Sequence, residues 1–246
     1  MSAVSQLFFS AVTALAPRKF FTDLRASLET HIDFQELAGL IDADSPVLLL
    51  GAADVLSGEL KKFNSREGEI CVEEILASAA IPTLFPAVAV GNSFYWDGLF
   101  SDNPPLKELL RSKFVGAAVP DEIWVIQINP TRIPTVPTTT SEIIDRRNQM
   151  TGNVSLMQSV EFVEFCNHLL REKALAHEVL ERYGFFRRDP VEIRYIRMSD
   201  ELQQELDYVS KLSREPSHVQ KLIADGEQQA RRFLAALETP ESGTAP

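Results

Sequence analysis

An α/β fold is predicted by two apolar runs of strand character and by helical apolar patterns on either side of them. The runs Val47–Ala53 and Ile123–Ile128 are short and apolar, as expected for strands buried on both faces of a sheet. Apolar residues recur at helical spacing in 20–32 and again across 139–184. This mixture of strands and helices favours an α/β architecture.

We expect one domain over residues 1–238, because the sequence contains neither an internal repeat nor a clear linker. In chain order its three parts are helical, then a sheet, then mainly helical: 1–45, 46–130 and 140–238. The proline- and threonine-rich stretch 131–140 is typical of an extended surface loop. Residues 239–246 are expected to form a disordered tail.

The N-terminal region is predicted to be helical. Residues 1–17 are apolar, but the first positive charges follow the run instead of preceding it, unlike a signal peptide. We interpret 1–17 as a helix that packs on the core, with a surface helix that touches a membrane as the alternative. A second helix is expected over 20–32, and Asp33 is expected to cap a third, with Glu36 as its capping-box partner.

The sheet region contains two hairpin signals. Ser57-Gly58 is expected to turn the first apolar strand into a polar partner at 59–63. Gly91-Asn92 is a two-residue hairpin turn between the β-rich runs 87–90 and 93–96.

A carboxylate follows the second of these hairpins. Asp97 ends an aromatic strand and is followed by Gly98, a residue that lets a backbone or ligand approach closely. By itself, an Asp-Gly pair is common in turns without any functional role. Asp102 or Asn103 is then expected to cap a helix that has prolines in its first turn and runs through Leu106–Leu110.

The C-terminal part is expected to open with a capping box of Thr139 and Glu142. The helical pattern runs on to Gly184, and 151–153 is a candidate interruption. We interpret its methionine and phenylalanine stripe as core and not as a lipid groove. A strand over 191–198 and two helices that begin at Ser199 and Ser217 complete the prediction.

The ordered string around Asp97 resembles the C-terminal catalytic block of patatin-like lipid acyl hydrolases. The matching residues are Ala77–Pro82, Phe85-Pro86, Tyr95–Gly98 and Asn103-Pro104, and Val125–Pro130 with 136–143 is similar to a bacterial branch of the family. The likeness covers about residues 20–170. It implies a patatin-like three-layer α/β fold, with a mostly parallel central sheet flanked by helices and with the N-terminal strands missing.

The resemblance also implies roles for individual residues. Asp97 matches the aspartate of a Ser–Asp dyad, the general base of acyl-ester hydrolysis, and Gly98, Asn103 and Pro104 match residues that support the motif. Leu99 departs from the pattern, because the family usually has glycine or alanine there.

The sequence does not contain the motif that carries the serine nucleophile of that dyad. In the family it lies on a G-x-S-x-G turn, and no serine here has glycines at both flanking positions. We interpret Ser78 as a helix-packing residue. We therefore expect the C-terminal part of a lipid acyl hydrolase, inactive alone. The alternatives are a front-truncated pseudo-enzyme that binds a lipid or a partner, and a half-enzyme completed by another chain that carries the serine.

The amino-acid composition limits the classes of partner that the chain is expected to bind. A net charge of −11 and a pI of about 4.9 argue against nucleic acid. Two cysteines cannot form a disulfide framework, and the scattered histidines do not have metal-ligand spacing, so we expect reduced thiols and neither metal nor cofactor. The expected partners are a lipid or acyl ester, a transient membrane contact and a second copy at an exposed sheet edge. The expected location is the cytoplasm, with a membrane-peripheral site as the alternative.

Overall fold

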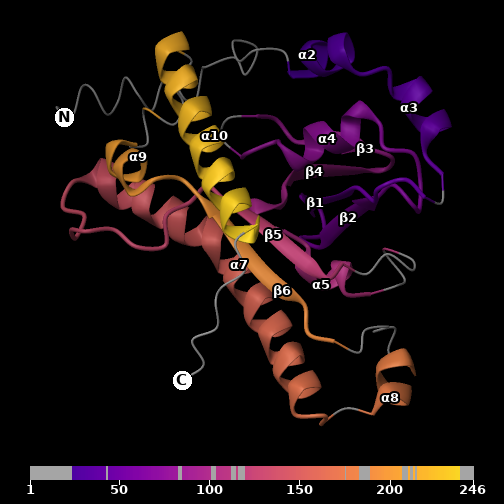
Figure 1. The fold of residues 1–246 in the computed structure, drawn as a ribbon. Helices are drawn as coiled ribbons and strands as arrows, with labels where there is room; N and C mark the ends of the chain where they lie inside the picture. Colours follow the sequence, from indigo (N-terminus) through magenta and orange to yellow (C-terminus); the bar gives the residue numbers. More distant parts are fainter. Residues whose placement is uncertain are drawn as a thin grey trace.

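The computed structural model of the chain describes residues 24–42, 44–82, 85–100, 104–111, 115, 120–174, 176–182, 189–206, 210, 213 and 215–238. Figure 1 shows the strands and helices in chain order. The strands are β1 (Leu49–Asp54), β2 (Leu60–Asn64), β3 (Val88–Val90), β4 (Ser93–Asp97), β5 (Glu122–Gln127) and β6 (Glu192–Arg197). The helices are α2 (Leu24–His31), α3 (Phe34–Leu40), α4 (Val72–Ser78), the 3-10 helix η1 (Gly98–Phe100), α5 (Leu106–Leu109), α7 (Thr140–Arg171), α8 (His177–Arg182), α9 (Asp200–Glu205) and α10 (Pro216–Glu238). The predictions for residues 1–23 and 239–246 lie outside the described residues.

Both hairpin predictions are confirmed. The order of the first sheet is β2-β1-β4-β3, and all of its neighbouring strands run antiparallel. Gly58, in the turn between β1 and β2, has a φ of +75°, and Gly91, between β3 and β4, has a φ of +59°. Glycine adopts this left-handed conformation without the steric cost that a side chain brings. Ala52, Phe63, Ile70, Ala77 and Tyr95 form the buried core between this sheet and α4.

The mostly parallel central sheet that we expected is not found in the described residues. Within them only β5 and β6 pair in parallel, as a separate two-stranded sheet. Within each hairpin the physical reason is the length of the connection: a short turn returns the chain antiparallel, whereas a parallel neighbour needs a long crossover. The crossover from β5 to β6 contains α7, and the strands of the first sheet have only short turns within each hairpin. The α/β mixture of elements is as predicted.

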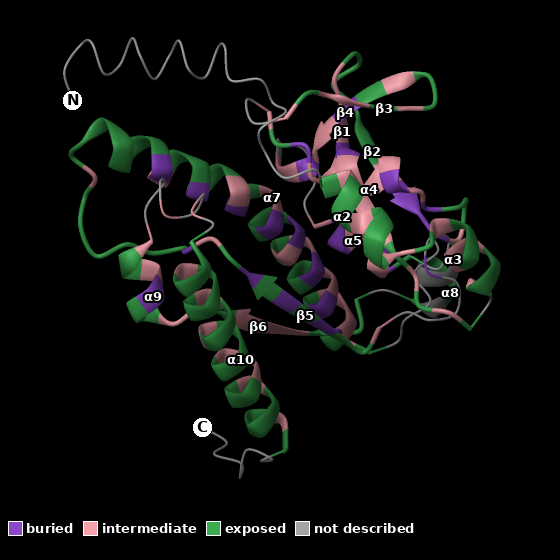
Figure 2. Cartoon of the chain, turned by 90° about the horizontal axis from the view of Figure 1, so that it is seen from above, coloured by how far each residue is buried: buried purple, intermediate pink, exposed green. Residues whose placement is uncertain are grey.

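The two apolar runs are strands, but the second is buried on one face only. The first strand begins at Leu49, two residues later than expected. Along β5, buried and exposed residues alternate strictly. Its buried face packs against α5 and α7 through Leu106, Leu110, Leu156 and Val163. On the other face, Trp124 meets the ring of Phe233 in α10 at a centroid distance of 4.9 Å. Figure 2 shows β5 and β6 between α7 and α10, a local three-layer arrangement.

Helix α7 confirms the capping box and corrects the predicted helix length. Thr139 accepts a hydrogen bond from the Glu142 N–H, and the Glu142 carboxylate accepts one from the Thr139 N–H. The helix continues through 151–153 without interruption and ends at Arg171, well before residue 184, which lies outside the described residues. At position 152 a Cβ would lie 2.6 Å from Nδ2 of Asn129, so this glycine permits close packing and does not interrupt the helix.

The remaining cap predictions have mixed outcomes. Asp33 and Ser199 cap α3 and α9 as expected, but among the described hydrogen bonds the Glu36 side chain does not return a bond to the Asp33 N–H, so the expected capping box is only half formed. The short helix α5 begins at Leu106, with Pro105 in the cap position, so neither candidate cap at 102 or 103 precedes it directly. Helix α10 begins at Pro216, so Ser217 lies within its first turn. Proline is favoured at that first position because its missing N–H would be unpaired there anyway.

The start of η1 lies directly on the backbone of β1. A Cβ at position 98 would lie 2.7 Å from both the carbonyl carbon and the carbonyl oxygen of Gly51. Real Cβ atoms do not approach a backbone that closely, so glycine is required at 98 for packing. This contact fixes the turn that follows Asp97 against the central strand.

We predict that Gly98→Ala destabilises the chain by about 1–3 kcal/mol, because the added methyl group must displace the β1 backbone. Denaturant unfolding measures the loss. Gly226→Ala in α10 is the matched control, since no atom lies within 4 Å of its Cβ position. The free energy of unfolding of the control should rise by about 0.5–1 kcal/mol, because alanine favours the helix more than glycine does. Equal effects of the two variants would contradict the packing argument.

Candidate active site

Asp97 is the last residue of β4, and three elements hold its backbone. In the sheet it lies opposite Ala52 of β1. Its N–H donates to the carbonyl of Ala80, just after α4, over 3.0 Å. Gly98 follows it and rests on Gly51. The carboxylate therefore starts from a backbone that is fixed by a strand, by the end of a helix and by a close glycine contact.

One oxygen of the Asp97 carboxylate is held and the other is available. The N–H of Leu99 donates to Oδ1 over 2.8 Å. Among the described residues, none donates a hydrogen bond to Oδ2. The side chain is partly buried, and this burial raises the pKa of Asp97, while the hydrogen bond from Leu99 lowers it by less. The result is a carboxylate with a raised pKa and one acceptor oxygen free for a proton donor, which is what a general base requires.

The structure accommodates Leu99, the residue that departs from the family pattern. A Cβ at position 152 of α7 would lie 3.0 Å from Cδ1 of Leu99, so the larger side chain at 99 fits because residue 152 has none. The turn after Asp97 is thus packed between β1 on one side and α7 on the other. No local sequence signal links positions 99 and 152, and we did not predict this contact.

The other predicted site residues have different outcomes. Gly98 lies next to Asp97, as described. Pro104 is partly buried, and its carbonyl accepts the N–H of Leu106 over 2.9 Å. Asn103 lies outside the described residues. Ser78 is the last residue of α4 and is partly buried. No role in chemistry follows from these positions.

Two buried polar groups in the matched region of the fold were not predicted. The indole N–H of Trp96 is buried and finds no hydrogen-bond acceptor in the part of the chain that the structure describes. Glu108 of α5 is buried and pairs with Lys62 of β2, which joins α5 to the first sheet. A buried carboxylate in an apolar helical stretch is a sequence signal for such a pair, since isolated buried charges are costly.

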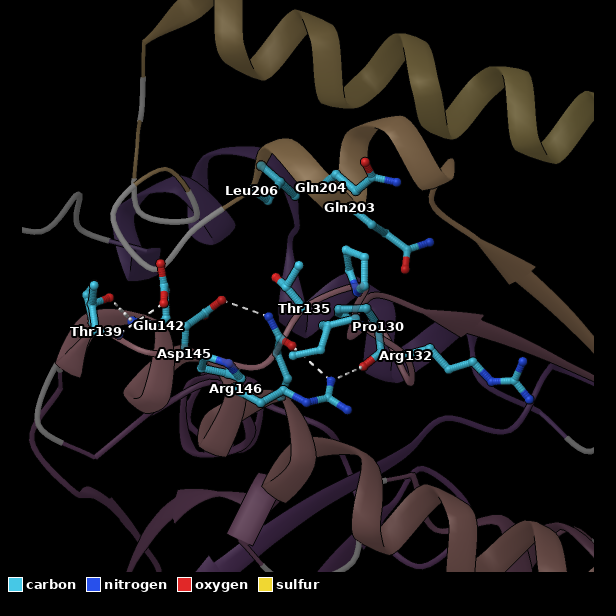
Figure 3. A pocket seen from close by; sticks show the side chains of 15 residues that line it. Pro130, Arg132, Thr135, Thr139, Glu142, Asp145, Arg146, Gln203, Gln204 and Leu206 are labelled. Atoms are coloured by element: carbon cyan, nitrogen blue, oxygen red, sulfur yellow. Dashed lines mark hydrogen bonds between the residues drawn. The ribbon is translucent and has the colours of Figure 1, made fainter.

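A cavity of about 570 Å³ lies away from Asp97, between the loop at 130–137, the first turns of α7 and helix α9 (Figure 3). Its wall is a hydrogen-bonded network. Arg146 donates to the carbonyls of Pro130 and Thr131, and Gln149 donates to Asp145 over 2.7 Å. Asp97 does not line this cavity. The guanidinium of Arg146 and the amide of Gln149 are thus used to hold the cavity wall together.

Neither a metal cluster nor a membrane span is found in the described ranges. Within them, no three His, Cys, Asp or Glu side chains are grouped so that they could hold a metal ion. No helix among them combines the length and apolar character needed to cross a bilayer.

The raised pKa of Asp97 predicts a stability change with a defined sign. Because its folded-state pKa lies above the unfolded value of about 3.9, its contribution to stability is complete below that value and is lost as the pH rises through the folded-state pKa. Asp97→Asn keeps an oxygen for the Leu99 N–H and removes the charge. We expect this variant to melt at a higher temperature than the wild type at pH 7, with the gain vanishing at a pH of about 3.

Asp54→Asn is the control of opposite sign. The Ser93 hydroxyl and the backbone N–H of Ser57 donate to Asp54 and lower its pKa. Its contribution is present at neutral pH and is lost as the pH falls, so Asn at 54 should lower the melting temperature at pH 7. Melting curves followed by circular dichroism at both pH values measure the two effects. A lower melting temperature for Asp97→Asn at pH 7 would rule out a desolvated carboxylate at 97.

Comparison with known proteins finds a match over the segment that contains Asp97. Residues 50–110 match a family model described as patatin-like phospholipase. The matched segment begins in β1, contains α4, β4 and Asp97, and ends just after α5. No curated protein matches the chain. The resemblance seen in the sequence is thus confirmed over residues 50–110, which are similar to the patatin-like phospholipase family.

Proposed function

We propose that this chain supplies the general base of a Ser–Asp dyad in a patatin-like lipid acyl hydrolase, and that Asp97 is that base. The observation that carries the proposal is the state of its carboxylate. Oδ1 is held by Leu99, Oδ2 has no donor among the described residues, and burial raises the pKa. Asp97 also lies within the segment that matches the family model.

In this mechanism the Oδ2 atom of Asp97 takes the proton of a serine hydroxyl as the serine oxygen attacks the carbonyl carbon of the acyl ester. Asp97 passes this proton to the alcohol as the alcohol leaves, and an acyl-serine intermediate remains. Asp97 then takes a proton from water, whose oxygen attacks the acyl carbon, and returns that proton to the serine oxygen as the fatty acid is released. A raised pKa serves both proton transfers, because it makes the carboxylate a stronger base near neutral pH.

The serine must come from outside these 246 residues, because none of their serines lies in a G-x-S-x-G turn. It is supplied by further residues of the same protein or by a second chain. The substrate class is a lipid acyl ester. Chain length and head group depend on the acyl-binding surface, to which the serine segment contributes.

We expect the 246-residue chain to show no ester hydrolysis alone and to hydrolyse acyl esters when a segment with the serine turn is joined to it or co-expressed. In the active form, Asp97→Asn should lower kcat about 10²- to 10⁴-fold, the usual contribution of a general base, with little change in KM. Release of p-nitrophenol from acyl esters measures both constants.

Asp54→Asn is the matched control, an aspartate on the same sheet that contacts a serine and a turn instead of the proposed site. Its kcat should equal that of the wild type. Turnover by the isolated chain, abolished by Asp97→Asn, would overturn the claim that the serine lies elsewhere. Full activity of Asp97→Asn would overturn the role of Asp97.

The second candidate is a binding protein that keeps the acyl-binding surface without chemistry, and the missing serine turn favours it. It predicts saturable binding of a fluorescent fatty acid to the isolated chain. Activity restored by a serine-bearing segment would exclude it, and an absence of binding would also count against it.

The proposed substrate suggests where the protein acts. A lipid hydrolase must reach its substrate at a membrane surface, so transient membrane contact belongs to the proposal. The cysteines Cys71 and Cys166 are free, which supports a reducing compartment such as the cytoplasm. An edge of the β5–β6 sheet is a further candidate site for association between copies.

A further inference from the structure

Helix α7 turns many polar side chains inward. Its buried residues are mostly polar: Asp145, Gln149, Asn153, Ser159 and Asn167, with Leu156 and Val163 among them. Its outward side is mixed, and the most exposed of its large apolar side chains there are Ile143, Met150, Val154, Met157 and Phe165, each between 51% and 59% exposed. Soluble helices normally have the reverse arrangement. The expectation that the Met and Phe stripe forms core is therefore wrong for Val154 and Met157.

The buried polar side chains serve the backbone of the loop that follows β5. Asn153 donates from Nδ2 to the carbonyls of Asn129 and Pro130, and its Oδ1 accepts from Gln127. Arg146 donates to the carbonyls of Pro130 and Thr131. Buried carbonyls need donors, and α7 provides them. This accounts for the inward polar face but leaves the outward apolar face without a function in the fold.

The outward apolar residues, which we call the α7 stripe, lie along one line of the helix, which Arg147 and Glu161 share with them. The stripe consists of Ile143, Met150, Val154, Met157 and Phe165. At about 100° per residue these positions lie within about 40° of a single line along the helix, and they extend over about 33 Å. Scattered exposed apolar residues are ordinary, but five of them aligned over this length indicate an interaction surface. In Figure 2 buried residues on α7 alternate with exposed ones, as expected for a helix covered on one side.

The charges along the stripe argue against a lipid surface as its partner. Arg147 lies on the line in its N-terminal part, and Glu161 lies on the line in its C-terminal part, with Glu164 next to it. Interfacial helices are flanked by lysine and arginine, whereas this stripe has charges of both signs and the chain carries −11 overall. Charges of opposite sign in the two halves of the stripe instead favour a partner with the reverse order of charges.

We infer that the α7 stripe is a self-association surface, on which two copies of this chain pair antiparallel through their α7 helices about a twofold axis at Val154. In that pairing, residues equally distant from Val154 face each other. Arg147 and Glu161 are each seven residues from Val154, so each arginine meets the glutamate of the other copy.

The same axis aligns the apolar residues. Ile143 and Phe165 are each eleven residues from Val154 and therefore face each other across the pair. Met150 and Met157 lie on either side of the axis, where flexible thioether side chains fill the gap between two helices. Within the described part of the chain, Arg147 and Glu161 have no ion-pair partner, so both are available for it. The ion pairs at the rim set the register, and the apolar line provides the buried area.

A charge exchange tests the register directly. Arg147→Glu or Glu161→Arg alone places like charges opposite each other, and each should weaken dimerisation at least tenfold. The double variant with both changes restores opposite charges at both rim pairs, and its dimer affinity should return to within about threefold of the wild type. Sedimentation velocity over a range of micromolar concentrations measures the monomer–dimer equilibrium, and far-UV circular dichroism checks that each variant is folded.

Two further variants separate this surface from others. Met157→Glu places a charge within the stripe and should abolish the dimer, whereas Val136→Glu, at an 84% exposed position of the loop before α7, should not change it. A wild-type chain that stays monomeric throughout would overturn the proposal. A dimer whose affinity does not change with the substitutions at 147 and 161 would also overturn it, and association through a sheet edge would give that result. A double variant that fails to restore the affinity lost in the single variants would overturn it as well. Wild-type monomers that pellet with phosphatidylcholine vesicles, and lose this with Met157→Glu, would assign the stripe to lipid instead.

Discussion

The contact between Gly98 and the backbone of Gly51 is the constraint on which the arrangement around Asp97 depends. A strand and a 3-10 turn can approach this closely only because residue 98 has no side chain, since a Cβ there would lie 2.7 Å from the backbone of Gly51. The turn after Asp97 is therefore pressed onto β1, while Gly152 of α7 gives room to Leu99 on the opposite side. The orientation of the carboxylate follows from packing on both sides of one short turn.

The polar inner face of α7 is the second organising feature. Its amides replace part of the backbone pairing that a larger sheet would provide. Asn167 donates to the carbonyl of Val191 and accepts the N–H of the same residue, both over 2.8 Å. Asn153 likewise donates hydrogen bonds to the carbonyls that follow β5. Because the amide side chains of α7 point inward, several of its apolar side chains lie on the outside. The character of the outer surface of α7 therefore follows from the hydrogen bonds that the neighbouring loops need.

Asp97 shows how a candidate catalytic group is at odds with stability. A carboxylate that is partly buried with a single donor is less stable in its charged form than one in water. Asp54, on the same sheet, has a hydroxyl and backbone donors, and its pKa is lowered instead. The two aspartates differ in their surroundings and not in residue type. An under-solvated carboxylate at the end of a strand is costly for the fold and useful for proton transfer, which is typical of functional sites.

Features that depend on neighbours in the chain could be predicted from the sequence. Glycine turns at 58 and 91, the caps at Asp33 and Thr139 and the position of Asp97 at a strand end all follow from local chemistry, and the role of Asp97 came from its family resemblance. Strand direction, the fit of Leu99 against α7 and the outward position of the α7 stripe could not be predicted. Periodicity shows that two faces of a helix differ, but only the packed chain decides which face is covered, because that depends on which distant groups need hydrogen-bond partners and which need apolar contact.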